Sequence, residues 1–170
     1  MSDTYYVKTF GGLEITNDNV TVNIVELFGK QLVNLLQVLL FHSEKPVQKD
    51  ELIDILWPES KNPSSALKFS IFRLRSELNE IEFFKDKEVI VTTRKGYILN
   101  PNLDWNIDFV ELEKAYNQIN DGSELLDEKE FKTARKIFRL YQGRFYASPS
   151  QLHWILQKQE IFRQMYVKTL

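Results

Sequence analysis

Positively charged side chains gather in one stretch of a sequence that is slightly acidic overall. The segment from Lys61 to Leu78 contains Lys61, Lys68, Arg73 and Arg75 but only one acid, Glu77. Arginine can pair in a bidentate way with guanine or with a phosphate, and lysine acts as a point charge. The chemistry that these residue types predict is the binding of phosphates and base edges.

The same segment has the periodicity of a helix that must position these cations. Leu67, Ile71, Leu74 and Leu78 recur on one helical face. Pro63, with Ser64 or Ser65 as the cap, predicts where this helix begins. At about 100° per residue, other side chains point away from the apolar face or flank it. They are Ser65, Lys68, Phe69, Ser70, Phe72, Arg73, Arg75 and Ser76. An amphipathic helix with a solvated basic face and a helix that enters a DNA major groove both fit this pattern.

The totals limit the possible classes of protein. The chain has 170 residues, 43% hydrophobic and 27% charged, with a net charge of −2. This length suits one medium domain or two small ones. The absence of cysteine excludes disulfides, thiolate metal sites and thiol nucleophiles. No apolar run has membrane-spanning length and no signal peptide is recognisable, so we expect a cytoplasmic protein without a membrane partner.

The elements around the basic helix have the order of a helix-turn-helix. Short β-rich runs over residues 5–10, 13–15 and 20–22 predict a small antiparallel sheet. A leucine-rich helix over Lys30–His42 is apolar enough to be buried on more than one side. A second helix over Lys49–Trp57 and a short polar link then lead to the basic helix.

A β-hairpin with a basic tip is expected next. Val89–Thr92 and Gly96–Leu99 are β-rich runs that flank Thr93, Arg94 and Lys95. A hairpin directly after a helix-turn-helix is a wing. Arg94 and Lys95 would then face the DNA backbone or the minor groove.

The character of the sequence changes after Pro101–Asn106, which we interpret as a linker between domains. Three helices are expected beyond it, over 108–119, 128–141 and 152–170, with a turn at 121–123. Their aromatic and alanine residues at helical spacing favour helix-on-helix stacking, as in solenoid repeats. The last helix runs to Leu170 without a stop signal, so we expect the chain to be a fragment of a longer protein.

These residues together resemble a known family. The motifs that carry the resemblance are Lys30-Gln31 before the leucine-rich helix, Pro46-Val47, residues 50–57, Arg73-Leu74-Arg75 with Leu78, and residues 92–97. They are similar to the OmpR/PhoB-type winged helix, and more closely to its use in SARP-type bacterial transcriptional activators. In that class a helical bacterial transcriptional activator domain of tetratricopeptide-like hairpins follows. The opening of that domain is similar to Asp108-Phe109 here. Its second hairpin is similar to Tyr141-Gln142-Gly143 with Trp154, Phe162, Met165, Tyr166 and Leu170.

The resemblance implies an α+β winged helix-turn-helix domain over residues 1–100 and the start of an all-α, tetratricopeptide-like domain over 107–170. It implies a sequence-specific, DNA-binding transcription regulator with double-stranded DNA as its partner. RNA polymerase and a second copy of the chain are further candidate partners, and no cofactor or metal is expected. Carried over by position, the expected DNA contacts are Trp57, Ser65, Lys68, Ser70, Arg73, Arg75, Arg94 and Lys95.

Phe69 and Phe72 depart from the family pattern, which more often has small, aliphatic or polar residues at these groove-facing positions. Phe69 suits contact with a thymine methyl group, and Phe72 suits contact with a neighbouring domain. The two aromatic rings and the acidic balance keep an alternative open: an interaction module whose winged helix no longer binds DNA. An enzyme is the least favoured class. His42 and His153 lack metal-ligand spacing, no two carboxylates stand out as an acid and base pair, and there is no Gly-rich phosphate loop.

Overall fold

The computed structural model describes residues 4–119, 128–147 and 152–170. The chain forms two compact units. One is Glu26–Asp104, called here the winged-helix unit, and the other combines the residues up to Val25 with Trp105–Leu170, called here the sheet-helix unit. The turn expected at residues 121–123 lies outside the described residues. Among the described helices, none has the length and apolar character needed to span a membrane.

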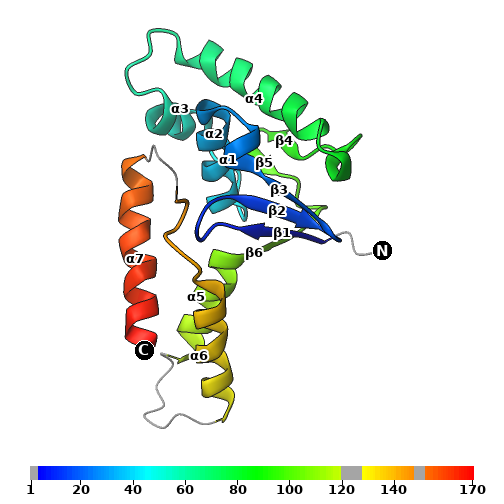
Figure 1. The fold of residues 1–170 in the computed structure, drawn as a ribbon. Coiled ribbons are helices and arrows are strands. Elements are labelled where there is room, and N and C mark those ends of the chain that lie inside the picture. The colour runs from blue at the N-terminus through cyan, green and yellow to red at the C-terminus, as the bar shows by residue number, and fades with distance from the viewer. Residues whose placement is uncertain (1–3, 120–127, 148–151) are drawn as a thin grey trace. The chain divides into compact units, whose positions relative to one another are not determined.

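The winged-helix unit contains three helices and a hairpin (Figure 1). Its helices are α2 (Lys30–Phe41), α3 (Lys49–Leu56) and α4 (Pro63–Asn79), followed by the 3-10 helix η1 (Glu82–Phe84). Its hairpin pairs β4 (Ile90–Thr93) with β5 (Gly96–Leu99) in antiparallel register. A short helix that we did not expect, α1 (Ile24–Leu27), begins just before the unit. The helices and the hairpin therefore agree with the order predicted from the sequence.

Apolar faces decide how the helices of this unit pack. Every residue of α2 from Leu32 to Leu40 is buried, which confirms the expectation of burial on more than one side. Helix α4 buries Leu67, Ile71, Leu74 and Leu78 and packs against both α2 and α3. The apolar stripe of α4 therefore fixes which of its side chains remain exposed.

The start of α4 differs from the expected cap. Asn62 is the N-cap and Pro63 is the first helical residue, so the cap expected at Ser64 or Ser65 is wrong. Ser65 instead donates its hydroxyl to Asn62 Oδ1 at 3.4 Å. Proline is favoured at the first helical position because its missing N–H would have no partner within the helix there.

The hairpin is attached to the chain before α3. Val47 and Tyr97 exchange two backbone hydrogen bonds, Val47 N to Tyr97 O at 2.8 Å and Tyr97 N to Val47 O at 3.0 Å. Gly96 makes this approach possible, because a Cβ there would lie 1.9 Å from the carbonyl oxygen of Val47 and its φ is +144°. The Tyr97 ring also has Lys49 Nζ 5.9 Å from its centroid. The position of the basic turn is thus set by backbone contacts of the hairpin.

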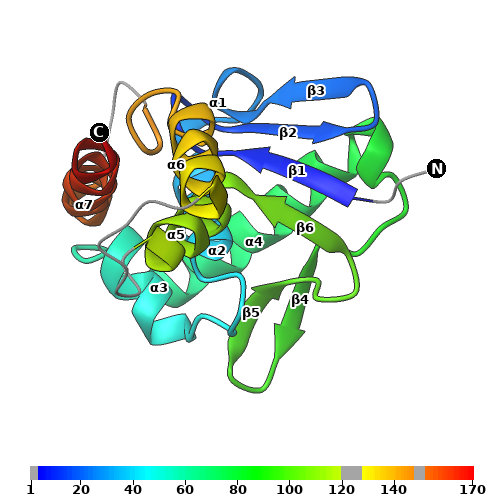
Figure 2. The same cartoon turned by 90° about the horizontal axis from the view of Figure 1, so that it is seen from below.

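The sheet-helix unit has a four-stranded sheet with the order β3-β2-β1-β6 (Figure 2). The strands are β1 (Thr4–Lys8), β2 (Glu14–Asn17), β3 (Val20–Asn23) and β6 (Asp104–Ile107). The first three form the expected antiparallel sheet. The linker expected over Pro101–Asn106 is wrong in its second half, because β6 starts at Asp104 and lies next to β1. The edge of a sheet satisfies the backbone groups of this short polar segment.

Asp108, the first residue of α5 (Asp108–Ile119), connects that helix to the end of β1. Its carboxylate accepts hydrogen bonds from Thr9 N at 2.9 Å, from the Thr9 hydroxyl at 2.5 Å and from Phe10 N at 3.1 Å. Burial raises the pKa of the Asp108 carboxyl, and the hydrogen bonds from Thr9, Phe10 and Phe109 oppose this rise. The carboxylate joins residues that are 99 positions apart in the sequence.

The core of the sheet-helix unit is aromatic. Phe10 has ring-centroid distances of 5.3 Å to Phe162 and 6.0 Å to Phe145, and Phe109 lies 5.6 Å from Phe145. These rings join the sheet to α5, to the segment after α6 (Glu128–Leu140) and to α7 (His153–Thr169). The three helices have the expected ranges to within about two residues. These helices share their compact unit with the sheet, whereas the sequence predicts the sheet as part of the first domain.

Candidate nucleic-acid interface

The exposed face of α4 carries the cations that the sequence singled out. Its exposed residues include Ser65, Lys68, Phe69, Phe72, Arg73 and Ser76. No acidic residue occurs between Pro63 and Ser76. The apolar stripe of α4 is buried on the other side, so this face is available to a negatively charged partner.

Arg73 lies near the middle of the exposed face. Its guanidinium is 3.8 Å from Glu77 Oε1, one helical turn further on, and its carbon Cζ is 6.0 Å from the centroid of the Phe69 ring. The Arg73 side chain is 53% exposed. An exposed ion pair of this kind contributes about 0–1 kcal/mol. Arg73 can therefore leave Glu77 for another anion at little cost.

Arg75 is bound inside the winged-helix unit, which the sequence did not indicate. Its Nε and Nη2 donate to the carbonyl oxygen of Ile90 at 3.2 and 3.0 Å, and Nη2 also donates to the Thr92 hydroxyl at 2.7 Å. Its guanidinium carbon lies 6.0 Å from the centroid of the Tyr97 ring. The phosphate contact expected for Arg75 does not fit this arrangement. Arg75 fixes the first strand of the hairpin against α4.

Ser70 requires a second correction. It was expected to contact a phosphate, but it is only 7% exposed and belongs to the buried side of α4. At about 100° per residue, Ser70 points about 40° away from Leu74 and so lies at the edge of the buried stripe, on the side nearer to Arg73. Because Ser70 is buried there, its hydroxyl is not available to a phosphate.

The turn of the hairpin presents Arg94 and Lys95, and both are exposed. Thr93 shapes this turn, because its hydroxyl accepts hydrogen bonds from Lys95 N and Gly96 N, each at 3.2 Å. The same hydroxyl lies 3.0 Å from the carbonyl oxygen of Gly96, to which it donates. Thr93 is a residue of the site that the sequence did not predict. The signal in the sequence was a hydroxyl residue directly before the two basic residues, because serine and threonine hydroxyls often hydrogen-bond to the backbone of a turn.

Trp57 and Ser65 complete the set of expected contacts. Trp57 is half-buried at the end of α3, where its backbone N–H donates to Ile53 O at 2.8 Å. Ser65 is exposed in the first turn of α4. Seven of the eight expected residues are thus at least partly exposed in the winged-helix unit. Ser70 is buried, and Arg75 is partly exposed but hydrogen-bonded to the hairpin.

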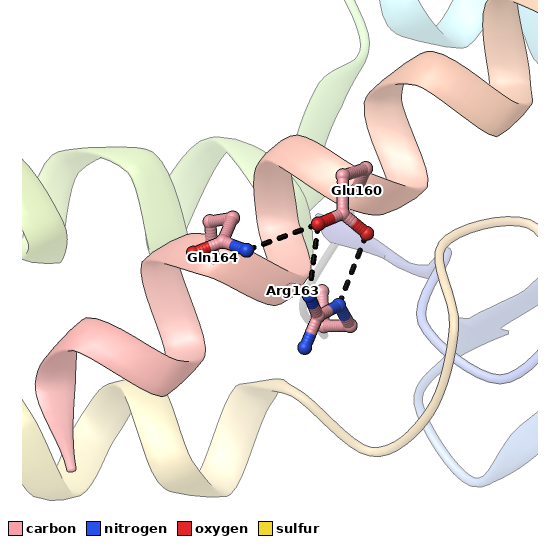
Figure 3. Close-up of polar contacts among 3 residues, drawn as sticks. All are labelled: Glu160, Arg163 and Gln164. Atoms are coloured by element: carbon pink, nitrogen blue, oxygen red, sulfur yellow. Dashed lines mark hydrogen bonds and ion pairs between the residues drawn. The ribbon is translucent and has the colours of Figure 1, made fainter.

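A second surface feature lies in the sheet-helix unit, where α7 and Tyr116 of α5 line an open cavity of about 720 Å³. Glu160 of α7 is one of its lining residues and accepts hydrogen bonds from Arg163 Nε at 3.0 Å, Arg163 Nη2 at 2.8 Å and Gln164 Nε2 at 3.0 Å (Figure 3). These hydrogen bonds, with that of Arg163 the strongest, lower the pKa of the Glu160 carboxyl to about 2. This cavity has mixed charge, whereas the exposed face of α4 has no acidic residue from Pro63 to Ser76.

Comparison with known proteins points to regulators of transcription. Residues 23–99 match the family model described as "Transcriptional regulatory protein, C terminal". No curated protein sequence matches the chain.

The solved structures that are similar to this chain include those of EmbR and CadC. The structure of Mycobacterium tuberculosis EmbR in complex with a low-affinity phosphopeptide has a TM-score of 0.67 and 18% sequence identity, and the match covers 97% of this chain and 43% of that chain. The DNA-binding domain of E. coli CadC has a TM-score of 0.41 and 26% identity, with 55% of this chain and 89% of that chain covered. The chain thus spans less than half the length of the EmbR chain and shares its fold there. Residues 23–99 therefore match the C-terminal domain of transcriptional regulatory proteins, and this part of the chain has a winged-helix-type α+β fold.

Proposed function

We propose that the winged-helix unit binds double-stranded DNA and that the chain acts as a transcription regulator. In this proposal α4 lies in the major groove, and the β4–β5 turn contacts the adjacent minor groove or backbone. The observation that carries the proposal is the exposed, cationic face of α4, which has no acidic residue from Pro63 to Ser76, in a segment that matches a family of transcriptional regulators. An α-helix with its side chains is about 10–12 Å across, which suits a major groove about 12 Å wide.

Each exposed residue has a distinct role in this proposal. Arg73 and Lys68 project toward base edges or phosphates, with Ser65 beside them in the first turn of the helix. Arg94 and Lys95 supply the contacts of the wing. Trp57 offers its indole N–H to a phosphate at the end of α3. Arg75 has no direct contact and instead holds the hairpin in position through Ile90 and Thr92.

We also propose which function each part of the chain has. DNA binding is assigned to the winged-helix unit, within the expected first domain of residues 1–100, and residues 107–170 are assigned to the start of a tetratricopeptide-like activator domain. Candidate partners of that second part are RNA polymerase and a second copy of the chain. The resemblance of the sequence to SARP-type activators supports this assignment.

Alanine variants test the proposal through the affinity for duplex DNA. Duplexes are first selected from a random library with the whole chain, and affinities are measured by fluorescence anisotropy at one low salt concentration. Arg73→Ala is expected to weaken binding to a selected duplex by about 1–3 kcal/mol, as expected for a base contact, and to weaken unselected duplexes less. Arg139→Ala is the matched control, because it removes the same charge from an exposed site in the sheet-helix unit. Equal affinities for wild type, Arg73→Ala and Arg139→Ala would sink the proposal.

The exposure of Phe69 and Phe72 favours the alternative function, an interaction module that no longer binds DNA. Under that alternative, Phe72→Ala abolishes a protein complex of the chain while neither Arg73→Ala nor Arg94→Ala changes binding to any DNA. Analytical ultracentrifugation of the Phe72→Ala variant, run beside the anisotropy measurements, separates the two functions.

A further inference from the structure

Two phenylalanine rings are exposed on α4 without an apolar neighbour to cover them fully. Phe69 is 62% exposed and Phe72 is 70% exposed. They lie three residues apart, so their directions differ by about 60° and both belong to the face opposite the buried stripe. Single exposed apolar residues are common on protein surfaces. Two large rings side by side on one helical face suggest a contact surface.

The charge around the rings restricts the kind of surface that they fit. Lys68 and Arg73 are exposed beside them, and the Arg73 guanidinium carbon lies 6.0 Å from the centroid of the Phe69 ring. The nearest acid along the helix is Glu77. A partner for this face must offer negative charge around small apolar points. The major groove of DNA does so, because the thymine methyl group is apolar and phosphates line both of its edges.

We infer that Phe69 and Phe72 determine sequence specificity by contacting thymine 5-methyl groups in the major groove. This inference rests on the proposed function of the winged-helix unit and adds the base that it recognises. Carbon–carbon contact between a ring and a methyl group removes apolar area of both from water.

The chemistry of the phenylalanine ring also disfavours G·C pairs. A G·C pair presents two acceptors on guanine and an amino donor on cytosine to the major groove, without a methyl group. Phenylalanine can neither donate nor accept a hydrogen bond, so a ring placed there leaves these groups dehydrated and unpaired. The two rings are separated by about 4.5 Å along the helix axis, at 1.5 Å per residue. Base pairs follow one another every 3.4 Å or so, a similar spacing, so the two rings are close enough together to contact neighbouring pairs.

Replacing thymine by deoxyuracil tests the inference, because the exchange removes only the methyl group. Duplexes selected by the whole chain from a random library are remade with deoxyuridine at single thymidine positions. At the positions read by the rings, the affinity is expected to fall about fourfold per methyl group, the factor that corresponds to burying one methylene-sized group. Each ring is expected to read one of these positions. The Phe69→Ala and Phe72→Ala variants should therefore each lose the preference for thymine over deoxyuracil at one position and keep it at the other.

Leu27→Ala is the control, since Leu27 is 54% exposed in the same unit but outside α4. It is expected to keep the full thymine preference. Salt-dependent binding that requires Arg73 but ignores the methyl group would overturn the inference and leave the proposed function standing. No binding of the wild type to any duplex would overturn both. Loss of self-association in Phe72→Ala, with the thymine preference unchanged, would assign the rings to a second copy of the chain instead.

Discussion

Arg73 and Arg75 are two residues apart on α4, and the helix gives them different environments. A separation of two residues turns the side chain by about 200°, so Arg73 lies on the exposed face and Arg75 at its edge beside the hairpin. There the Arg75 guanidinium binds the Ile90 carbonyl and the Thr92 hydroxyl. A planar group with five N–H donors readily satisfies such neighbouring oxygens. The helical periodicity predicts that Arg75 lies outside the apolar stripe. It does not predict that β4 lies beside Arg75.

Glu160 provides a prediction at the residue scale, because its pKa of about 2 depends first on Arg163. Arg163→Met is expected to raise this pKa toward the ordinary value of 4.5. A carboxyl whose pKa is lowered on folding adds stability above its ordinary pKa, and this stability is lost as the pH falls from 4.5 through about 2. NMR titration of the Glu160 carboxyl carbon measures the shift. Lys168→Met removes the same charge from α7 and should leave the pKa low, and an unchanged pKa in Arg163→Met would contradict the assignment.

At the scale of elements, the hairpin depends on one close approach of two backbones. The β4–β5 hairpin is joined to the chain before α3 by the two hydrogen bonds between Val47 and Tyr97. Gly96 lies directly beside them, and its lack of a side chain leaves room for the Val47 carbonyl. The position of Arg94 and Lys95 in the turn therefore depends on Gly96.

Gly96→Ala is expected to lower the free energy of unfolding by at least about 2 kcal/mol, because the new Cβ meets Val47 O and the φ of +144° is strained for alanine. Urea unfolding followed by circular dichroism measures the change. Gly29→Ala is the control in the same unit, since a Cβ there meets nothing within 4 Å. A change below about 1 kcal/mol is expected for it, and a similar small change for Gly96→Ala would show that the hairpin contact is unimportant.

Elements with strong local patterns could be predicted from the sequence, and an element that depends on a distant partner could not. The leucine periodicity of α2 and the apolar stripe of α4 are local signals, as is the alternation that gave the hairpin. Strand β6 has four residues, Asp104–Ile107, and no such signal. It is a strand because β1 offers an edge, about one hundred residues earlier in the chain. We therefore expected a linker there.

At the scale of the whole molecule, the two compact units are not consecutive in the sequence. The chain up to Val25 belongs with Trp105–Leu170, and Glu26–Asp104 forms the other unit between them. The contact of Asp108 with Thr9 and the aromatic rings around Phe10 hold the first and last parts together. A domain boundary predicted from a change in composition depends only on neighbouring residues. It therefore cannot show that the first 25 residues pack with the last part of the chain.

The net charge of −2 also belongs to this scale, because it conceals a local excess of cations. DNA binding depends on the number of phosphates neutralised at the interface and not on the total charge of the chain. The winged-helix unit presents Lys68, Arg73, Arg94 and Lys95 at the proposed interface. The response of DNA affinity to salt counts such contacts directly.

The measurement that tests the central claim most directly is the dependence of duplex affinity on salt concentration. The logarithm of the association constant is plotted against the logarithm of the salt concentration for the whole chain. We predict a slope of about −3 to −4, as expected for three or four neutralised phosphates. In a variant with both Arg94→Ala and Lys95→Ala, the slope should become shallower by about two units, since each lost contact removes about one. A slope near zero, or one that is unchanged in the double variant, would contradict the claim that α4 and the wing bind DNA.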